Sequence, residues 1–177
     1  MYQEGSVQAL GYDDMNEAQP LYVRSPGGPY RLATDSQVLA AARIAAESLI
    51  ADGSQFNAPA QVKKFFQAKL CGLGHECLAV VYLNAQLKVI RYIEHSHGTL
   101  SQVSVYPREI VKTALRLNAA GLIMSHNHPS GIAEPSVADL SLTRHLKQAL
   151  DLIEVRLIDH IILAGKTAVS LVERGQM

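Results

Sequence analysis

The sequence has few cysteines and no long apolar runs, and each shortage excludes a class of protein. Its two cysteines, Cys71 and Cys77, are spaced neither as a CxxC redox motif nor as a zinc knuckle. Both lie among apolar residues, which favours buried free thiols and a reducing compartment. No apolar stretch approaches the roughly 20 residues that a membrane-spanning helix needs. We therefore expect reduced thiols and no membrane association.

The chain also lacks an excess of either charge. Sixteen basic residues balance sixteen acidic ones, so the net attraction to phosphate groups is small and nucleic acid is an unlikely partner. The N-terminal stretch contains Glu4, Asp13, Asp14 and Glu17 and no basic run, which excludes a secretory signal peptide. Internal repeats and low-complexity segments are also missing from the sequence.

What is present fits one globular domain. The 177 residues are 48% hydrophobic and 18% charged, which is ordinary for a protein with a sizeable core. Residues 1–34 show no sustained periodicity and include several glycines and prolines, so we expect a flexible arm with a short strand at residues 21–23. The domain itself is expected over residues 35–177, with a leading helix in residues 35–56 and the core of the domain in residues 57–177.

Hydrophobic periodicity and turn residues predict helices and strands throughout that domain. The most apolar segment, residues 75–83, predicts a central strand. Such an order indicates an α/β fold with helices packed against a mixed sheet. The predicted helices cover residues 36–51, 57–69, 107–118 and 137–152, and the predicted strands cover residues 75–83, 86–93, 103–106, 119–124, 155–163 and 167–171. In the third helix, the apolar stripe is expected to bury Ile110, Val111, Ala114 and Leu115.

Two histidines, His126 and His128, stand one residue apart where the strand at residues 119–124 ends. Strand alternation puts both imidazoles on one side of the chain, where they can grip one metal ion. A new helix opens at Ser136, and Asp139 lies in its first turn. Two histidines and one carboxylate make three protein ligands, the number typical of a catalytic zinc site with a fourth position for water. Two plainer interpretations compete, namely solvated loop histidines and a helix cap formed by Ser136 and Asp139 alone.

The combined spacing of the two histidines, Ser136 and Asp139 is more specific than any of its parts. It resembles the signature of the JAMM (MPN-type) metalloproteases, and the flanking residues 125–131 and 159–162 resemble the RadC family within that group. The resemblance extends from about Asp35 to the C-terminus. It implies an MPN-type (cytidine-deaminase-like) α/β sandwich of a mixed sheet with flanking helices, a bacterial cytoplasmic protein, and a Zn²⁺ cofactor.

The resemblance also implies an activity, the hydrolysis of a peptide or isopeptide bond by a metal-activated water. The two histidines and Asp139 would hold the zinc ion. Glu76 would carry the proton, and Ser136 would stabilise the developing oxyanion. Glu94, near the end of the neighbouring strand, is a competing candidate for the base, and the plainer interpretation of Glu76 is a strand-end residue in solvent.

Four other histidines are expected to have no ligand role. His95 and His97 form a second His-x-His pair, for which solvated strand-end side chains are the default. His75 and His145 show no partner in the sequence, so we expect them at the surface.

Two further residues lie beside residues of the expected site. His160, which follows Asp159 in a predicted strand, matches the RadC family and is expected to support the site without binding the metal. Cys77, next to Glu76, is expected to point to the opposite face of the sheet because strand side chains alternate.

The family resemblance leaves two alternative functions. One is a DNA-repair accessory protein, after the traditional description of the RadC family, and the other is a metal-free MPN interaction module, although every ligand position is filled here. Longer family members carry an N-terminal helix-hairpin-helix domain, and the stretch before Glu76 is too short for it, so we expect a short form without that domain. The substrate is unidentified, since no insertion resembles those that bind ubiquitin in eukaryotic relatives, and the sequence does not predict an oligomeric state.

Overall fold

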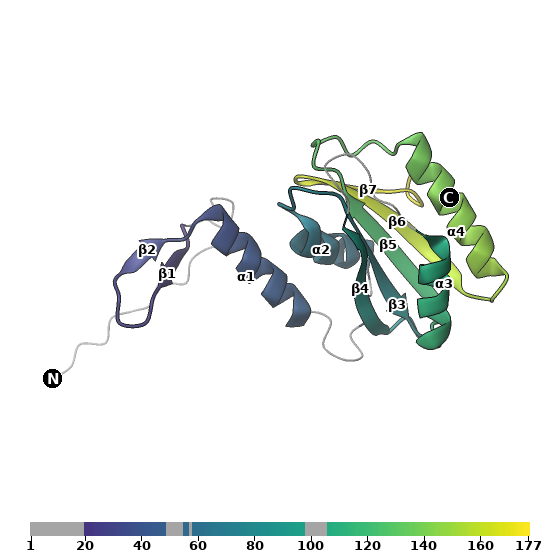
Figure 1. Ribbon diagram of the computed structural model, residues 1–177, viewed down its shortest axis with the longest axis horizontal. Coiled ribbons are helices and arrows are strands. Elements are labelled where there is room, and N and C mark those ends of the chain that lie inside the picture. The colour runs from purple at the N-terminus through teal and green to yellow at the C-terminus, as the bar shows by residue number, and fades with distance from the viewer. Residues whose placement is uncertain (1–19, 49–54, 57, 98–105) are drawn as a thin grey trace. The chain divides into compact units, whose positions relative to one another are not determined.

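The computed structural model describes residues 20–48, 55–56, 58–97 and 106–177 (Figure 1). The chain divides into two compact units, residues 1–38 and residues 39–177. Among the described residues, every helix is too short or too polar to cross a lipid bilayer.

The first unit contains a two-stranded antiparallel hairpin of β1 (Tyr22–Arg24) and β2 (Tyr30–Leu32). Its turn is closed by a bond of 2.9 Å from the backbone N–H of Gly28 to the carbonyl of Ser25. Gly27 has a φ of 74°, which the third position of a type II turn requires and glycine adopts without strain. The strand predicted at residues 21–23 is thus confirmed as β1, whereas its partner β2 was not predicted.

The second unit is built on a five-stranded mixed sheet, which confirms the predicted α/β class. Its strand order is β4-β3-β5-β6-β7, and only the β5–β6 pair is parallel. Every residue of β3 is buried and the strand lies inside the sheet, as its apolar sequence predicted. The strands are β3 (Cys77–Leu83), β4 (Val89–His97), β5 (Gly121–Asn127), β6 (Arg156–Ala164) and β7 (Thr167–Ser170), and the helices are α1 (Asp35–Ser48, which begins in the first unit), α2 (Pro59–Leu70), α3 (Pro107–Arg116) and α4 (Val137–Asp151).

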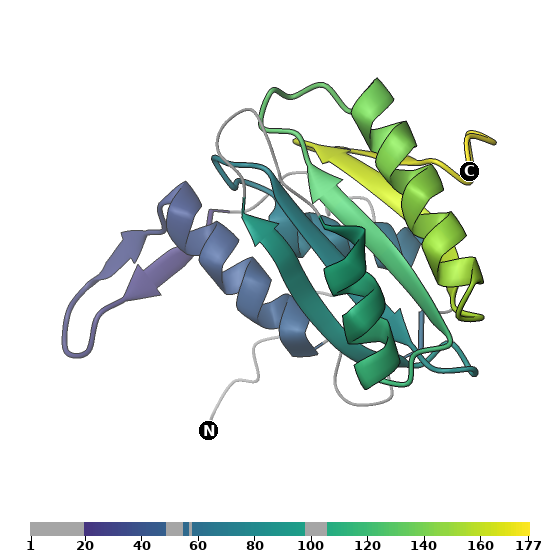
Figure 2. The same cartoon turned by 45° about the vertical axis from the view of Figure 1, so that its right-hand side comes forward.

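Helices cover both faces of this sheet. Helix α2 packs on one face, while α3 and α4 lie side by side on the other (Figures 1 and 2). Strand alternation divides the core accordingly. Toward α2 point the residues Cys77, Ala79, Val81, Leu83, Ile123, Ile161 and Leu163. Toward α3 and α4 point Leu78, Val80, Tyr82, Leu122, Met124 and Leu157.

Helix α3 buries a narrower stripe than the sequence predicted. Ile110 and Ala114 of α3 are fully buried and Val111 packs at the edge of the core, but Leu115 is 59% exposed, so its predicted burial is wrong. Only one side of α3 touches the sheet, and a residue 100° around the helix from Ala114 lies outside that contact. The strand predicted at residues 103–106 falls largely outside the described residues.

Candidate metal centre

The site forms where the end of β5 meets the start of α4. Strand β5 continues through His126, which lies opposite Leu78 of β3 and therefore faces α4. Beyond the strand, the backbone N–H of His128 donates to the carbonyl of Leu163 at 2.7 Å, which keeps the chain against β6. Asp139 comes to the same place from the first turn of α4.

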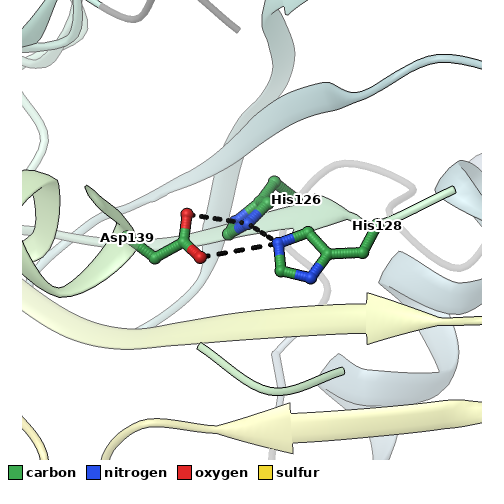
Figure 3. A group of neighbouring side chains, drawn as sticks. All are labelled: His126, His128 and Asp139. Atoms are coloured by element: carbon green, nitrogen blue, oxygen red, sulfur yellow. Dashed lines mark hydrogen bonds and ion pairs between the residues drawn. The ribbon is translucent and has the colours of Figure 1, made fainter. Parts of the chain in front are cut away.

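Two histidines and one carboxylate converge on a small volume (Figure 3). The Nε2 atoms of His126 and His128 are 2.8 Å apart. Asp139 reaches both rings, with Oδ1 at 3.1 Å from Nε2 of His126 and Oδ2 at 3.5 Å from Nε2 of His128. All three side chains are at most 14% exposed, so the ligand atoms are largely withdrawn from water.

The surroundings of the cluster favour positive charge. A hydrogen bond to Asp139 raises the pKa of His128, helped by the carbonyl of Ile132 and the charges of Asp139 and Glu76, while burial opposes the shift. Burial alone would raise the pKa of the Asp139 carboxyl, but hydrogen bonds from His126 and His128, and then from Ser136, hold it far below its usual range. A cation placed among these groups would be stabilised by the same partners.

The cluster passes a test of fit for zinc. Nδ1 of His128 lies 2.7 Å from the carbonyl oxygen of Ile132, so this nitrogen carries a hydrogen, and Nε2 is the atom that can bind a metal once its own proton is released. Two ligand atoms on a tetrahedral zinc ion lie roughly 3.3 Å apart. The observed separations of 2.8 to 3.5 Å bracket that value, and the donor set of two imidazoles and one carboxylate is common for zinc.

Asn127, between the two histidines, holds Glu76 beside the cluster, and sequence reasoning missed this role. Its side-chain oxygen accepts from the N–H of Cys77 at 2.8 Å, and its amide group donates to the carbonyl of His75 at 2.9 Å. The two bonds clamp the backbone on either side of Glu76, which is half-buried. Because Cys77 faces α2, alternation turns Glu76 toward the metal face, and its charge acts on His128.

Glu94, the competing candidate for the base, faces the other side of the sheet. It pairs with Ala79, whose side chain packs toward α2, and it accepts a hydrogen bond of 2.8 Å from the hydroxyl of Tyr92. Burial and then the charge of Glu94 raise the pKa of the Cys77 thiol to about 12, which also places this carboxylate on the α2 face. The structure therefore brings Glu76, and not Glu94, to the histidine cluster.

Ser136 caps α4 and binds the candidate ligand at the same time. Its hydroxyl donates to Oδ2 of Asp139 at 2.6 Å and accepts from the backbone N–H of Asp139 at 3.1 Å. Its own backbone N–H also donates to Oδ2 at 2.8 Å, so the two residues form a capping box. The helix cap and the metal cluster thus use the same carboxylate, and neither interpretation of this pair excludes the other.

The pair Asp159–His160 splits into two roles. Nε2 of the fully buried His160 lies 2.8 Å from Nδ1 of His126, so this residue contacts the cluster without joining it. The carboxylate of Asp159 instead accepts from the hydroxyl of Ser170 and the N–H of Val172. Asp159 therefore fastens the C-terminal segment.

The other histidines lie outside the cluster. Nε2 of His95 is 2.6 Å from the hydroxyl of Tyr82, and the ring is half-buried, so the expectation of a solvated side chain is wrong for this residue. Ile90 and Ile93 of the same strand, β4, pack against the core on this face of the sheet, and the Tyr82 hydroxyl also lies 3.5 Å from the carbonyl of Ile110 in α3. His145 is exposed, as expected, while His75 is half-buried. The side chain of His97 lies outside the described part of the structure.

A cavity of about 220 Å³ opens beside His128. The end of α2, the loop after β5 and the turn after β6 form its walls. Its lining residues carry no acidic or basic side chain other than the histidine. They are Leu70, Cys71, Gly72, Leu73, Asn127, His128, Pro129, Gly131, Leu163 and Gly165.

Comparison with known proteins agrees with this geometry. The model of the RadC-like JAB domain matches residues 56–176, which include the whole sheet and the cluster. The chain belongs to the RadC-like JAB domain family. Among its relatives, the UPF0758 protein Mpe_A2695 of Methylibium petroleiphilum is 47% identical over 148 residues, which cover 84% of this chain and 67% of the relative.

Two further members of the family extend the match. A UPF0758 protein of Bordetella petrii, Bpet3149, is 48% identical over 85% of this chain and 67% of its own length. A UPF0758 protein of a Janthinobacterium species is 43% identical over 98% of this chain and 76% of its own length. These similarities support a JAB (MPN-type) domain, and the printed names assign no activity.

Proposed function

We propose that the protein is a zinc-dependent hydrolase that cleaves a peptide or isopeptide bond. The observation that carries the proposal is the convergence of His126, His128 and Asp139, with Glu76 held beside them. The alternative, a metal-free interaction module, does not explain why three largely buried ligand atoms converge in an arrangement that attracts a cation. The proposed partner is a peptide or isopeptide and not a nucleic acid, since sixteen acidic residues offset sixteen basic ones.

Each residue has a role in the proposed reaction. Nε2 of His126, Nε2 of His128 and the carboxylate of Asp139 would hold the metal. Zinc in such a site supplies a nucleophile at neutral pH by lowering the pKa of a water molecule, and it polarises the carbonyl oxygen under attack. The carboxylate of Glu76 would take the proton from that nucleophile and pass it to the nitrogen of the leaving amine.

Ser136 has the least freedom in this scheme. Its one hydroxyl hydrogen is directed at Asp139, so a bond to the oxyanion requires the hydroxyl to turn away from that carboxylate. We therefore propose that Ser136 mainly holds Asp139, with stabilisation of the oxyanion as a second role.

The first experiment measures metal in protein prepared without a histidine tag. We expect elemental analysis to find about one zinc per chain in the wild type, and little in a His126→Ala, His128→Ala double variant. His95→Ala is the control and should keep the metal, because its ring contacts Tyr82. Zinc retained by the double variant would place the metal elsewhere and contradict the proposed site.

The second experiment tests hydrolysis on a panel of peptide and isopeptide substrates with and without a zinc chelator. Asp139→Asn should weaken zinc binding and activity together, because a neutral amide is a poor zinc ligand. Full activity of the metal-depleted protein would contradict a metal-dependent reaction.

A further inference from the structure

Thr143 of α4 links Asp139 on that helix to the histidines on the sheet, although its side chain touches none of the candidate ligand atoms. It lies one helical turn after Asp139 and is 1% exposed. Its hydroxyl donates to the backbone carbonyl of Asp139 at 2.6 Å, and the same oxygen lies 2.7 Å from Nδ1 of His160. His160 in turn contacts His126, so a continuous chain of hydrogen bonds runs from α4 to a candidate ligand on β5.

The single hydrogen of the Thr143 hydroxyl determines which atom donates and which accepts in each of these hydrogen bonds. A threonine hydroxyl has one hydrogen, and here the carbonyl of Asp139 accepts it. Nδ1 of His160 must therefore be the donor to Thr143. The ring of His160 is fully buried, its Nδ1 contacts the Thr143 hydroxyl and its Nε2 contacts another imidazole, so among the described residues neither nitrogen meets a carboxylate that could balance a charge. The ring is therefore neutral, and its Nε2 is an acceptor.

The direction of the chain decides the state of His126. Since Nε2 of His160 accepts, Nδ1 of His126 carries the hydrogen and donates it across 2.8 Å. Its Nε2 is then the ring nitrogen available to a metal, and it faces the second histidine and Asp139. Histidine ligands of metals commonly donate their other nitrogen to a carboxylate or a backbone carbonyl. Here a neutral histidine, itself oriented by a threonine, takes that place.

We infer that Thr143 and His160 are positioning residues that hold His126 in the tautomer able to bind a divalent metal, and that Thr143 thereby raises the metal affinity of the site. This inference rests on the proposed metal centre. Loss of an indirect partner of a ligand usually weakens metal binding by about tenfold to a hundredfold.

The test compares two substitutions of Thr143 with a matched control. Thr143→Val keeps the shape and removes the hydroxyl, whereas Thr143→Ser keeps the hydroxyl. Thr113→Val in α3 is the control, because Thr113 is also buried and also donates to the carbonyl four residues earlier, that of Glu109, at 2.8 Å. The two valine variants thus remove the same kind of helix hydrogen bond, and only one of them touches the chain to His126.

Zinc dissociation constants are measured by competition with a chromophoric chelator. We expect Thr143→Val to bind zinc about tenfold to a hundredfold more weakly, Thr143→Ser to stay close to wild type, and Thr113→Val to stay at wild type. Equal zinc affinity in Thr143→Val and wild type, or an equal loss in both valine variants, would overturn the inference and leave the proposed function intact.

A second measurement needs no metal. Long-range ¹H–¹⁵N spectra of the metal-free protein distinguish the two tautomers of each neutral imidazole. We expect hydrogen on Nδ1 of both His126 and His160 in the wild type, and a change of tautomer at His160 in Thr143→Val. The same tautomers in both proteins would overturn the inference. If the wild type bound no zinc while the tautomers still depended on Thr143, the proposed function would fail and the positioning chain would stand.

Discussion

Glu76 and Glu94 lie on neighbouring segments of one sheet, yet they face opposite sides and meet different surroundings. Glu76 is half-buried next to the histidine cluster, and its charge acts on His128. Glu94 lies on the α2 face, where it accepts a hydrogen bond from Tyr92. Strand alternation alone therefore places two carboxylates of the same chemical type in different surroundings.

The α2 face uses its polar groups to hold structure together. Lys69 is only 6% exposed, and its ammonium group lies 5.1 Å from the centre of the Tyr92 ring. The same group bonds to Glu47 of α1 at 2.8 Å. A cation buried in this way needs both partners, since an unpaired charge would lose its hydration without compensation. The face of α3 and α4, by contrast, brings two imidazole nitrogens and a carboxylate within 3.5 Å of one another, a group that could hold a metal ion.

The largest expected effect separates the two carboxylates. Glu76→Gln removes the proton acceptor but keeps the size of the side chain, so turnover on a cleavable substrate should fall roughly 10²- to 10⁴-fold. Zinc content should stay unchanged, because Glu76 holds no ligand position. Glu94→Gln is the matched control and should change turnover little. If Glu94→Gln lost cleavage and Glu76→Gln did not, the base would be Glu94 on the α2 face, and the role proposed for Glu76 would be wrong.

The second prediction concerns the thiols. Burial raises the pKa of Cys77 to about 12, and its side chain is fully buried, so the thiolate that reacts with an alkylating agent is both scarce and inaccessible. Alkylation followed by mass spectrometry should therefore modify the half-buried Cys71 long before Cys77. The rate at Cys77 should be the same with and without zinc, since this side chain faces α2. Protection of Cys77 by zinc would mean that the thiol reaches the metal.

The third prediction asks whether the α2 face is needed only for stability. Phe65 is fully buried and contacts the rings of Phe66 and Tyr92, with centroids 5.5 and 5.4 Å away. Phe65→Ala should lower the free energy of unfolding by about 3 to 5 kcal/mol, as measured by denaturant titration. The folded protein should still bind one zinc. Leu115→Ala is the control on the other face, and its loss should stay within about 0.5 kcal/mol because the side chain is 59% exposed.

The smallest effect is expected at the helix cap. Ser136→Ala removes one side of the capping box and should cost about 0.5 to 2 kcal/mol, which corresponds to a fall in melting temperature of a few degrees for a domain of this size. Ser136→Thr keeps the hydroxyl and should recover most of that loss. If Ser136→Ala lowered turnover far more than zinc affinity, the main role of the Ser136 hydroxyl would be to stabilise the oxyanion.

The part of the site that lies within one short segment was predictable from the sequence. His126 and His128 share a side because strand side chains alternate, and Asp139 is near because α4 begins three residues earlier at its cap. The same local rules predicted the buried strand β3 and the apolar stripe of α2, whose Val62, Phe65, Phe66 and Leu70 are all buried. The spacing of Asp139 and Thr143 also put both on one side of a helix, a signal that sequence reasoning did not use.

Only the tertiary structure decided which distant residues join these segments. His160 meets His126 across 34 residues of sequence, and Asn127 clamps His75 across 52. The choice between Glu76 and Glu94 likewise depended on the pairing of β3 with β4 and β5. Local periodicity tells which way a side chain points relative to its neighbours in the chain. Which strand lies beside which, and in what register, is determined by burial of apolar surface over the whole domain, and no single segment contains that information.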